Sequence, residues 1–592
     1  MSATDLPPII DDERLYTPEP GERQLTFRAV AAGCLLGGVV SAMNIYFGLR
    51  TGWSIGGSLI AAILGYSLFS VLPISKKYTR LEANITQTAG SAAGSMTSAA
   101  GLLAAIPALG MLGIKLNALE LGLWALSVAY LGVFFAVPLR RQMVLVEKLR
   151  FPTGTATGET IIAMFSSGGE AIRKSRSLVI WGILAAVFTL AAFFISPLGH
   201  PTIEWGIFGI IGAWGFSLLI NPLMTGAGIL IGPRVGASLF AGAVVSWGIL
   251  APWAQSEGLT TGSIMSYSDG PRGWILWPGV AIMVADALTQ LALSWRTIVA
   301  TFTRPKGSKN VVDTAPDTIP NSWWIGGLMV AATATTTLAW FVFAIPPHLT
   351  VVAILLSSVL AMIAVRSTGE TDINPIGGMG KVTQLVFGAL APGMMQVNLM
   401  CAGITGAGAS QAGDMMQDLK TGHLLGASPK SQFKAQLFGI GAGVLFCIPI
   451  YSLFDAAYDI GGEELPAPAA HAWKAMAELL SKGVDALPAG AEYAVAGGLA
   501  FGVIMAVLKK HGPPALTRFL PSGLAFGIAF IVPAYYSVAM FIGSLVLVVW
   551  QKVNPESAKA LAFSVASGLI AGEGLMGIVV AILTLLGVSA IV

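Results

Sequence analysis

The chain has 592 residues, of which 55% are hydrophobic and only 11% are charged. Soluble proteins carry about 25% charged residues, so this composition excludes an ordinary soluble domain, and the mean hydropathy of +0.76 agrees. The net charge of +3 says little about partners, and we expect membrane lipid but no nucleic acid among them. Many apolar runs approach the roughly 20 residues that cross a bilayer, which predicts an all-α protein that crosses the membrane many times.

Motifs of catalysis and metal binding are missing from the sequence. The three cysteines lie far apart in apolar runs, so they indicate neither a zinc site nor a disulfide framework. The string PIGGMGKV (375–382) lacks the first Gly and the final Ser/Thr of a P-loop. We therefore expect that the protein is not an enzyme and has no cofactor and no metal site. We expect that a gradient supplies the energy for its activity.

Segment 1–26 is acidic and lacks the basic start of a signal peptide, so we expect a short, mostly disordered cytoplasmic tail. About fourteen to sixteen transmembrane helices follow, together with apolar segments that Gly and Pro interrupt. The predicted spans are 27–49, 53–72, 84–111, 119–138, 177–196, 206–222, 236–252, 273–295, 323–345, 350–365, 433–454, 493–508, 535–551 and 560–588. The broken or re-entrant segments are 152–166, 382–410 and 518–533.

The loops alternate in charge, which predicts the orientation. Lys76, Lys77 and Arg80 lie in one loop, whereas the long loop 455–492 has seven acids and two lysines. Cytoplasmic loops are enriched in Lys and Arg. We therefore expect a cytoplasmic N-terminus, an external acidic loop and residence in the cell (inner) membrane. Large membrane-facing apolar surfaces also permit a homodimer.

A faint internal repeat indicates two diverged halves. LRFPTG (149–154) is similar to RFLPSG (518–523), and NITQTAGSAAGS (84–95) is similar to NLMCAGITGAGAS (398–410). Transporters are often built from such repeats, with the binding site where the halves meet. We expect transmembrane halves at 27–320 and 321–592, although chance similarity would give the same weak pattern.

Glu573 is the clearest candidate for chemistry. It is the one charge in the run 560–586, and glycines flank it on both sides. A carboxylate at mid-membrane depth is costly and marks a functional site by default. Burial favours its neutral form, so Glu573 could carry a proton and couple it to transport. The alternative is a protonated side chain that only links two helices.

Glu159, in the first broken segment, is a second candidate for proton coupling, or else a helix-terminal acid. The substrate-binding candidates are Tyr46, Asn84, Gln87, Asn398, Gln411 and Asp414. Each of these polar groups could instead make an interhelical hydrogen bond or an interfacial ion pair. The gating candidates are Glu370, Asp372 and Asn374, for which helix capping is the simpler alternative.

Several of these segments resemble one family. They are TRLEANITQT (79–88), PLRRQMVLVEKLRFPTGTATGETI (138–161), DMMQDLKTGHLLGASPKSQFKAQLFG (414–439) and ASGLIAGEGL (566–575). In this order they resemble blocks of the oligopeptide transporter (OPT) superfamily, within it the yellow stripe-like branch, in a prokaryotic-type form. Two departures are YYSVAM (535–540), which lacks an expected Asp, and Glu159, which stands where the plant pattern has an imidazole.

The resemblance implies a fold, a class of activity and a class of cargo. It implies a proton-coupled symporter that imports small oligopeptides or peptide-like compounds. Metal chelates of the nicotianamine or siderophore type are the alternative cargo. A passive facilitator or channel is the alternative mechanism, because broken, glycine-rich segments also suit pores.

Overall fold

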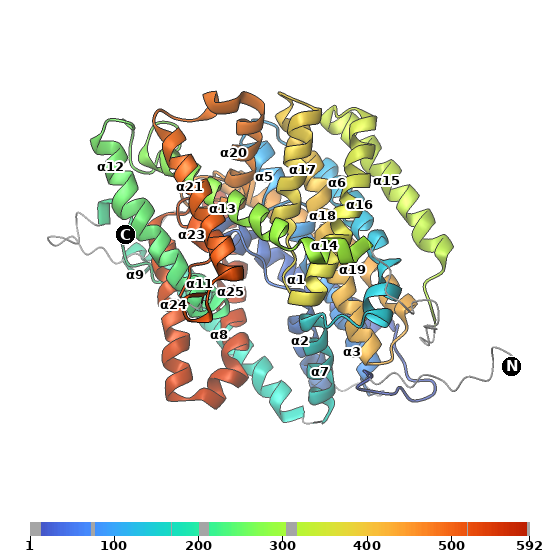
Figure 1. Ribbon diagram of the computed structural model, residues 1–592. Helices are drawn as coiled ribbons and strands as arrows, with labels where there is room; N and C mark the ends of the chain where they lie inside the picture. Colours follow the sequence, from blue (N-terminus) through green and yellow to red (C-terminus); the bar gives the residue numbers. More distant parts are fainter. Residues whose placement is uncertain are drawn as a thin grey trace.

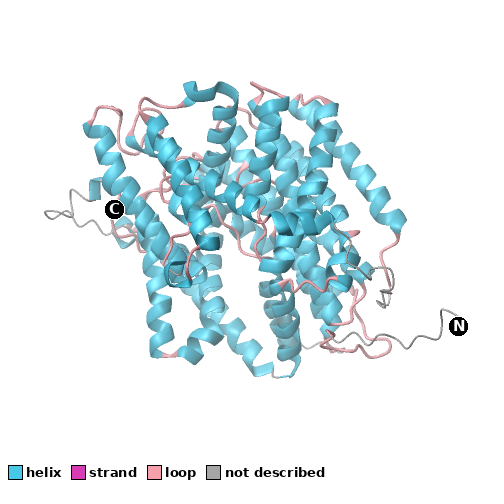
Figure 2. Ribbon diagram, in the orientation of Figure 1, coloured by secondary structure: helices cyan, strands magenta, loops and turns pink. Residues whose placement is uncertain are grey.

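The computed structural model describes residues 13–72, 77–166, 168–199, 212–302, 317–517 and 519–588. Within these ranges the chain is helical and forms no strand, as Figure 2 shows. The helices stand side by side in one bundle, with α15 along one edge and α12 along the opposite edge (Figure 1). The predicted fold class, an all-α polytopic membrane protein, is confirmed.

The first part of the chain contains long helices separated by several short ones. They are α1 (Phe27–Thr51), α2 (Gly57–Val71), α3 (Arg80–Gly94), α4 (Met96–Ala99), α5 (Ala105–Gly110), α6 (Ala118–Ala136), the π-helix η1 (Arg141–Val146), α7 (Pro152–Ser166), α8 (Gly168–Phe194), α9 (Ser196–Gly199), α11 (Pro222–Val245), the π-helix η2 (Ser246–Leu250), α12 (Ala251–Ser256), α13 (Pro271–Leu293) and α14 (Trp295–Phe302).

The second part has the same mixture. Its helices are α15 (Asn321–Phe343), α16 (Pro347–Thr371), α17 (Ile376–Leu390), α18 (Met395–Leu424), α19 (Pro429–Ala457), α20 (Pro468–Lys482), the 3-10 helix η4 (Gly483–Ala486), α21 (Ala491–His511), α22 (Pro514–Thr517), α23 (Gly523–Ile528), α24 (Ala534–Val553) and α25 (Pro555–Leu585).

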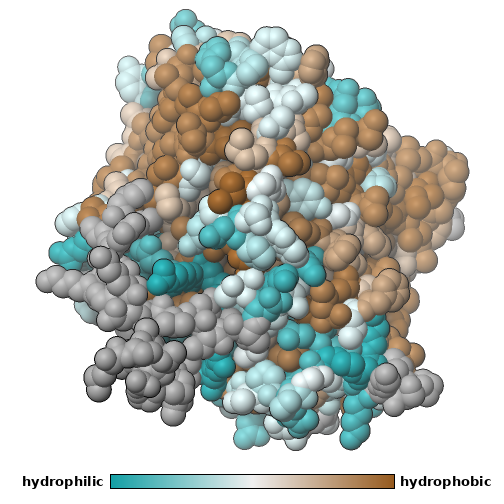
Figure 3. Space-filling view, turned by 90° about the vertical axis from the view of Figure 1, so that its right-hand side faces the viewer, coloured by the Kyte–Doolittle hydropathy of each residue, from teal (hydrophilic) through white to brown (hydrophobic). Residues whose placement is uncertain are grey.

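Eleven helices of the described chain are long and apolar enough to cross a membrane. They are α1, α6, α8, α11 continuing through α12, α13, α15, α16, α19, α21, α24 and α25. The helices α8 and α15 bury little of their apolar surface inside the bundle, and hydrophobic side chains cover much of the face in Figure 3. Lipid is the natural cover for such surfaces.

Three predicted segments differ from the structure. The predicted span 84–111 is broken into α3, α4 and α5, and Gly101 at the break has a φ of +76°, a conformation that suits glycine. Part of the predicted span 206–222 lies outside the described residues, and its described remainder reaches only the first residue of α11, Pro222. The predicted broken segment 152–166 is instead one continuous helix, α7. The predicted break within 382–410 is present, because α17 ends at Leu390 and α18 begins at Met395.

Helix α18 lies at the centre of the bundle. It has 30 residues, nearly all of them buried, and it contacts α3, α6, α7, α16 and α17. Its glycines allow this close packing: a Cβ on Gly408 would collide with Ser357, and one on Gly413 would collide with Asn374. This helix is too polar to resemble a simple span, but its length of about 45 Å is sufficient to cross the bilayer.

The N-terminal segment is more ordered than expected from residue 13 onward. Glu13 pairs with Lys420 at 3.1 Å, and the N–H of Leu15 donates to the carbonyl of Leu424 at 2.8 Å. The prediction of a mostly disordered tail is therefore wrong for residues 13–26, whereas residues 1–12 lie outside the described chain. The division into halves at residue 320 stays a prediction: α8 packs on α25 and α1 packs on α19, so the proposed halves interleave.

Candidate functional site

Glu573 lies in the middle of α25, where flanking glycines bring neighbouring helices close. A Cβ on Gly572 would collide with the Gly182 backbone of α8, and one on Gly574 would press on Met43 of α1. The glycines therefore serve helix packing, and α25 is continuous from Pro555 to Leu585. This close approach places the Glu573 carboxylate, which is 1% exposed, against α1 and the start of α11.

Three donors surround the Glu573 carboxylate. The Arg50 Nη1 lies 3.2 Å from Oε1, the Asn221 amide donates to Oε1 at 2.5 Å, and the Leu223 N–H donates to Oε2 at 2.8 Å. Asn221 is also the N-cap of α11, where its side-chain oxygen accepts from the Met224 N–H. A helix N-terminus with free N–H groups favours an anion, so this arrangement suits the ionised form of Glu573.

Arg50 occupies the last turn of α1, where the helix dipole favours a cation. Its guanidinium lies 4.4 Å from the centre of the Tyr46 ring and 5.8 Å from that of Tyr536. Gly52, with a φ of +81°, ends the helix and donates its N–H to the carbonyl of Gly48. Aromatic faces and a single carboxylate thus hold the guanidinium at the wall of a cavity.

This outer cavity, so named below, has a volume of about 1160 Å³. Its lining includes Tyr46, Arg50, Asn221, Tyr458, Tyr535, Tyr536 and Glu573, together with the acidic residues Asp459, Glu463 and Glu464. Those three acids are exposed and belong to the loop that we expect on the external side. The cavity therefore combines aromatic walls, an acidic mouth and one ion pair.

Two sequence candidates differ in their relation to this cavity. Tyr46 lines it and stacks on Arg50, beside Glu573. Glu159 does not belong to its lining: this residue is exposed on α7, which lies at the lower end of the bundle in Figure 1. The structure therefore does not bring the two predicted coupling acids together.

A second group of candidates meets between α3, α18 and α19, in what we call the polar seam. Gln87 donates to Asn84 at 3.1 Å, and Gln411 donates to Ser95 at 3.1 Å. Asp414 lies beside Ser95, one helical turn before Asp418. Four predicted substrate-binding residues, from spans far apart in sequence, therefore belong to one buried surface.

Several buried oxygens of the polar seam have no donor in the described structure, and the Asn84 amide nitrogen has no acceptor there. Ser58 donates to Asp418 at 3.4 Å, whereas the second carboxylate oxygen of Asp418 and the side-chain oxygen of Gln87 have no partner in the described structure. Gln432 Oε1 and Gln436 Oε1 are also unpartnered. Buried oxygens usually find a donor, so this seam offers acceptors to protons or to a polar donor.

Asn398, the remaining substrate candidate, lies elsewhere. It is near the start of α18, where its amide donates to the Gln384 carbonyl at 2.6 Å and accepts from the Gln384 side chain at 3.0 Å. Gln384 also donates to the Trp473 carbonyl. These bonds join α17, α18 and α20, and the geometry favours the interhelical alternative for this residue.

The gating candidates form contacts between helices at the end of α16. Asp372 accepts from the Thr153 N–H at 3.0 Å and from Gln417 at 2.7 Å, so it caps α7 and ties it to α18. Glu370 accepts from Thr297 of α14 at 3.0 Å and, within α16, from Arg366 at 3.0 Å. Asn374 donates to the Ala409 carbonyl at 2.8 Å. Helix capping, the alternative to a gating role, therefore describes the contacts of Asp372, although it caps α7, which is distant in sequence.

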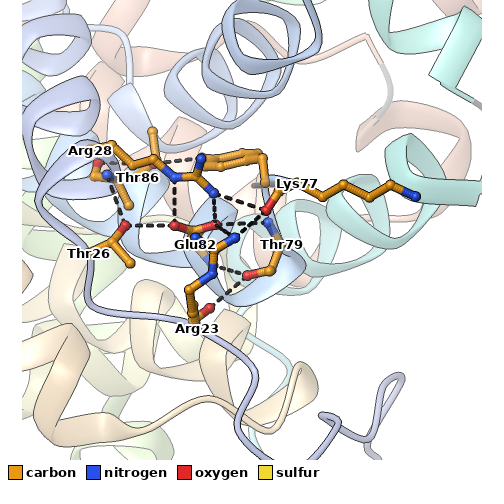
Figure 4. A network of polar contacts seen from close by, with 9 residues as sticks. Arg23, Thr26, Arg28, Lys77, Thr79, Glu82 and Thr86 are labelled. Atoms are coloured by element: carbon orange, nitrogen blue, oxygen red, sulfur yellow. Dashed lines mark hydrogen bonds and ion pairs between the residues drawn. The ribbon is translucent and has the colours of Figure 1, made fainter. Parts of the chain in front are cut away.

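A network around Glu82 secures the start of α3 (Figure 4). Arg28 Nη2 lies 2.6 Å from the carboxylate, Thr26 donates at 2.7 Å, and the Thr79 N–H donates at 3.1 Å. Burial alone would raise the pKa of Glu82, but the hydrogen bonds from Arg28, Thr26 and Thr79 outweigh it and hold the pKa below its ordinary value of 4.5. Glu82 thus anchors the N-terminal segment as an anion.

The sequence reasoning missed three residues that matter here. Arg50 and Asn221 complete the surroundings of Glu573, and Lys381 lines a second cavity. Arg50 and Lys381 each interrupt an otherwise uncharged stretch, which is the same signal that singled out Glu573. Asn221 carried no such signal, because Asn before Pro is common at helix starts.

Comparison with known proteins identifies the family. The model of the family described as "OPT oligopeptide transporter protein" matches residues 24–584. The chain belongs to the OPT oligopeptide transporter family. Its relatives include members of the yellow stripe-like branch, so the resemblance seen in the sequence is confirmed.

Two relatives illustrate the range of this family. The chain is 26% identical to "Putative oligopeptide transporter YGL114W" of Saccharomyces cerevisiae, over 95% of this chain and 96% of that protein. It is 27% identical to "Metal-nicotianamine transporter YSL1" of Arabidopsis thaliana, over 97% of this chain and 93% of that protein. This OPT chain is therefore a transporter, and its relatives divide between peptide and metal-chelate names.

Proposed function

We propose that this chain is a proton-coupled symporter of the cell membrane that imports small peptides or peptide-like metal chelates, and not an enzyme. The family and the names of the relatives support transport of these two cargo classes. The basic loop that contains Lys76, Lys77 and Arg80 supports a cytoplasmic N-terminus. The observation that carries the coupling is the Arg50–Glu573 pair in the wall of the outer cavity.

Proton binding and cargo binding would compete at this pair. While Glu573 is ionised, its carboxylate occupies the Arg50 guanidinium at 3.2 Å. A proton on Glu573 removes the attraction and leaves Arg50 available to a carboxylate of the cargo. Peptides end in a carboxylate, and chelators built from amino acids carry several. By reciprocity, a cargo carboxylate on Arg50 makes proton binding at Glu573 more favourable.

In this proposal the polar seam forms part of the path toward the cytoplasmic side. It follows α18 through Gln411, Asp414 and Asp418 toward the ion pair of Lys420 with Glu13. In this proposal Asn84 and Gln87 line the path. Asp372 closes it by tying α7 to α18. Glu159 remains a candidate for proton release because it is exposed on α7 near that end.

Uptake by proteoliposomes with an inward proton gradient tests the proposal. Labelled tri- to pentapeptides, glutathione and iron–nicotianamine are offered in parallel to the parent protein, to E573Q and to E556Q. Glu556 is a matched control because it is exposed on the first turn of the same helix. We expect accumulation above equilibrium that a protonophore abolishes, loss of this coupling in E573Q and no change in E556Q.

Two outcomes would contradict the coupling mechanism. Uptake by E573Q with the parent's rate and pH dependence would show that Glu573 does not couple protons. Equilibration that ignores the proton gradient, in the parent itself, would favour a passive facilitator. The cargo that accumulates decides between the peptide and metal-chelate alternatives.

A further inference from the structure

A second cavity lies on the other side of the short linker that follows α1. This inner cavity has a volume of about 340 Å³, and the linker Gly52–Ser54 forms part of its wall. Residues of α4, α5, α13, α17, α18, α20 and α23, and of the loops beside α5 and α17, complete its lining. Its size is at the lower end of the range for small-molecule sites. The linker begins two residues after Arg50, so the two cavities flank the same stretch of chain.

Lys381 is the one ionisable residue in the described lining of the inner cavity. It lies in the first half of α17 and is only 4% exposed. No hydrogen bond or ion pair joins its ammonium group to another residue that the structure describes. A buried lysine of this kind is uncommon, because buried charges are normally paired.

Close packing holds Lys381 in place. A Cβ on the preceding residue, Gly380, would collide with the ring of Trp473 from α20. That ring also lines the inner cavity, together with Trp53. Helix α17 therefore packs closely on α20 at this point, and aromatic rings line the same cavity as Lys381.

Asp286 on α13 is the acid whose charge acts on Lys381. It is itself buried at 4% exposure, accepts a hydrogen bond from Gln290 at 2.7 Å and forms no ion pair with Lys381. The negative charge of Asp286 therefore balances part of the positive charge of Lys381. Asp286 accepts no hydrogen bond from the ammonium group, whose three N–H donors stay without an acceptor in the described structure. An anionic oxygen inside the cavity would accept these hydrogen bonds.

We propose that the inner cavity is a carboxylate-binding subsite, in which Lys381 binds a carboxylate of the cargo. The inference rests on the proposed function, because it assigns the site to the same cargo class. Ser54 and Ser98, whose hydroxyls lie 2.9 Å apart at this cavity, supply further donors. The carboxylate would then meet one cation in each cavity, Arg50 in the outer and Lys381 in the inner one.

Binding to the purified full-length protein tests this subsite without a gradient. Trialanine and trialanine amide are titrated calorimetrically into the parent, K381M and K474M. Lys474 is the matched control: it follows Trp473 on α20 and pairs with Glu478. A charge-assisted hydrogen bond accounts for about a tenfold or larger preference for the free acid. We expect this preference in the parent and in K474M, and its loss in K381M.

A double variant keeps the test decisive if K381M folds poorly. Removing Lys381 leaves Asp286 without its compensating charge, so D286N/K381M should restore folding while the preference for the free acid stays lost. Persistence of the preference in K381M, its return in the double variant, or failure of the parent to bind trialanine would overturn the subsite. Uptake that is independent of a proton gradient would overturn the coupling mechanism, but it would not affect the binding comparison between trialanine and trialanine amide.

Discussion

The Arg50 guanidinium lies 3.2 Å from the Glu573 carboxylate, although 523 residues separate them in the chain. The pair joins the end of α1 to the middle of α25, and Asn221 adds the start of α11. Removing one partner of a buried ion pair is far more damaging than removing both. Three helices therefore depend on the charge balance of this one contact.

This dependence predicts the behaviour of charge-removing variants. R50Q leaves the Glu573 carboxylate buried without its cation, and we expect it to destabilise the protein by about 3 kcal/mol. R50Q/E573Q should lose less stability than R50Q, because no charge is then left uncompensated. Unfolding of the detergent-solubilised protein measures both, and E556Q should stay within about 0.5 kcal/mol of the parent. Equal losses in R50Q and the double variant would argue against coupling within the pair.

The Glu82 network predicts a pH dependence of stability. Burial alone would raise the pKa of Glu82, but the hydrogen bonds from Arg28, Thr26 and Thr79 together hold the folded-state pKa below its ordinary value of 4.5. The unfolded chain therefore binds the proton first, and the contribution of Glu82 is complete above pH 4.5. It declines as the pH falls through the lowered folded-state pKa.

Unfolding midpoints measured from about pH 6 down to pH 3 test this sign. We expect E82Q to be less stable than the parent at neutral pH, with a gap that narrows on acidification. E120Q is the matched control, because Glu120 occupies the equivalent capping position of α6 but is exposed to solvent. A gap between E82Q and the parent that grows toward acid would contradict the assignment.

The contact between α8 and α25 predicts a steric effect. G572A places a methyl group against the Gly182 backbone, and such overpacking costs about 1–3 kcal/mol. G326A, on the membrane-facing helix α15, adds the same methyl group where nothing lies within 4 Å. We expect it to be neutral or slightly stabilising, since alanine favours the helix. Thermal unfolding compares the two, and similar stability of both variants would show that α8 can move aside.

Asp372 predicts a local effect at the start of α7. D372A removes the cap on Thr153 and the bond from Gln417, and loss of an N-cap costs about 1 kcal/mol. Hydrogen exchange at the amides of Thr153 and Gly154 should become faster, while exchange in α6 stays unchanged. If D372A also alters uptake in proteoliposomes, the predicted gating role gains support. Unchanged exchange at both amides would contradict the capping contact.

Much of the fold could be read from local composition. Apolar runs of sufficient length predicted the spans of α1, α6, α13 and α25 within a few residues, because the cost of burying a backbone in lipid is a local property. The polar centre was harder. The predicted break within 382–410 lies directly before α18. Helix α18 itself contains glycine, glutamine and aspartate, so hydropathy alone did not predict that it runs unbroken to Leu424.

The sequence by itself determined that this protein crosses the membrane repeatedly, that it belongs with the OPT transporters and that Glu573 is buried in a span. Hydropathy, motif order and a lone charge are local signals, and they can be read from the sequence without a structure. Only the tertiary structure decided that Glu573 meets Arg50 and Asn221, that Glu159 lies elsewhere and that Lys381 faces a cavity. Each of these depends on which helix faces join over hundreds of residues, and that is set by packing of the whole bundle.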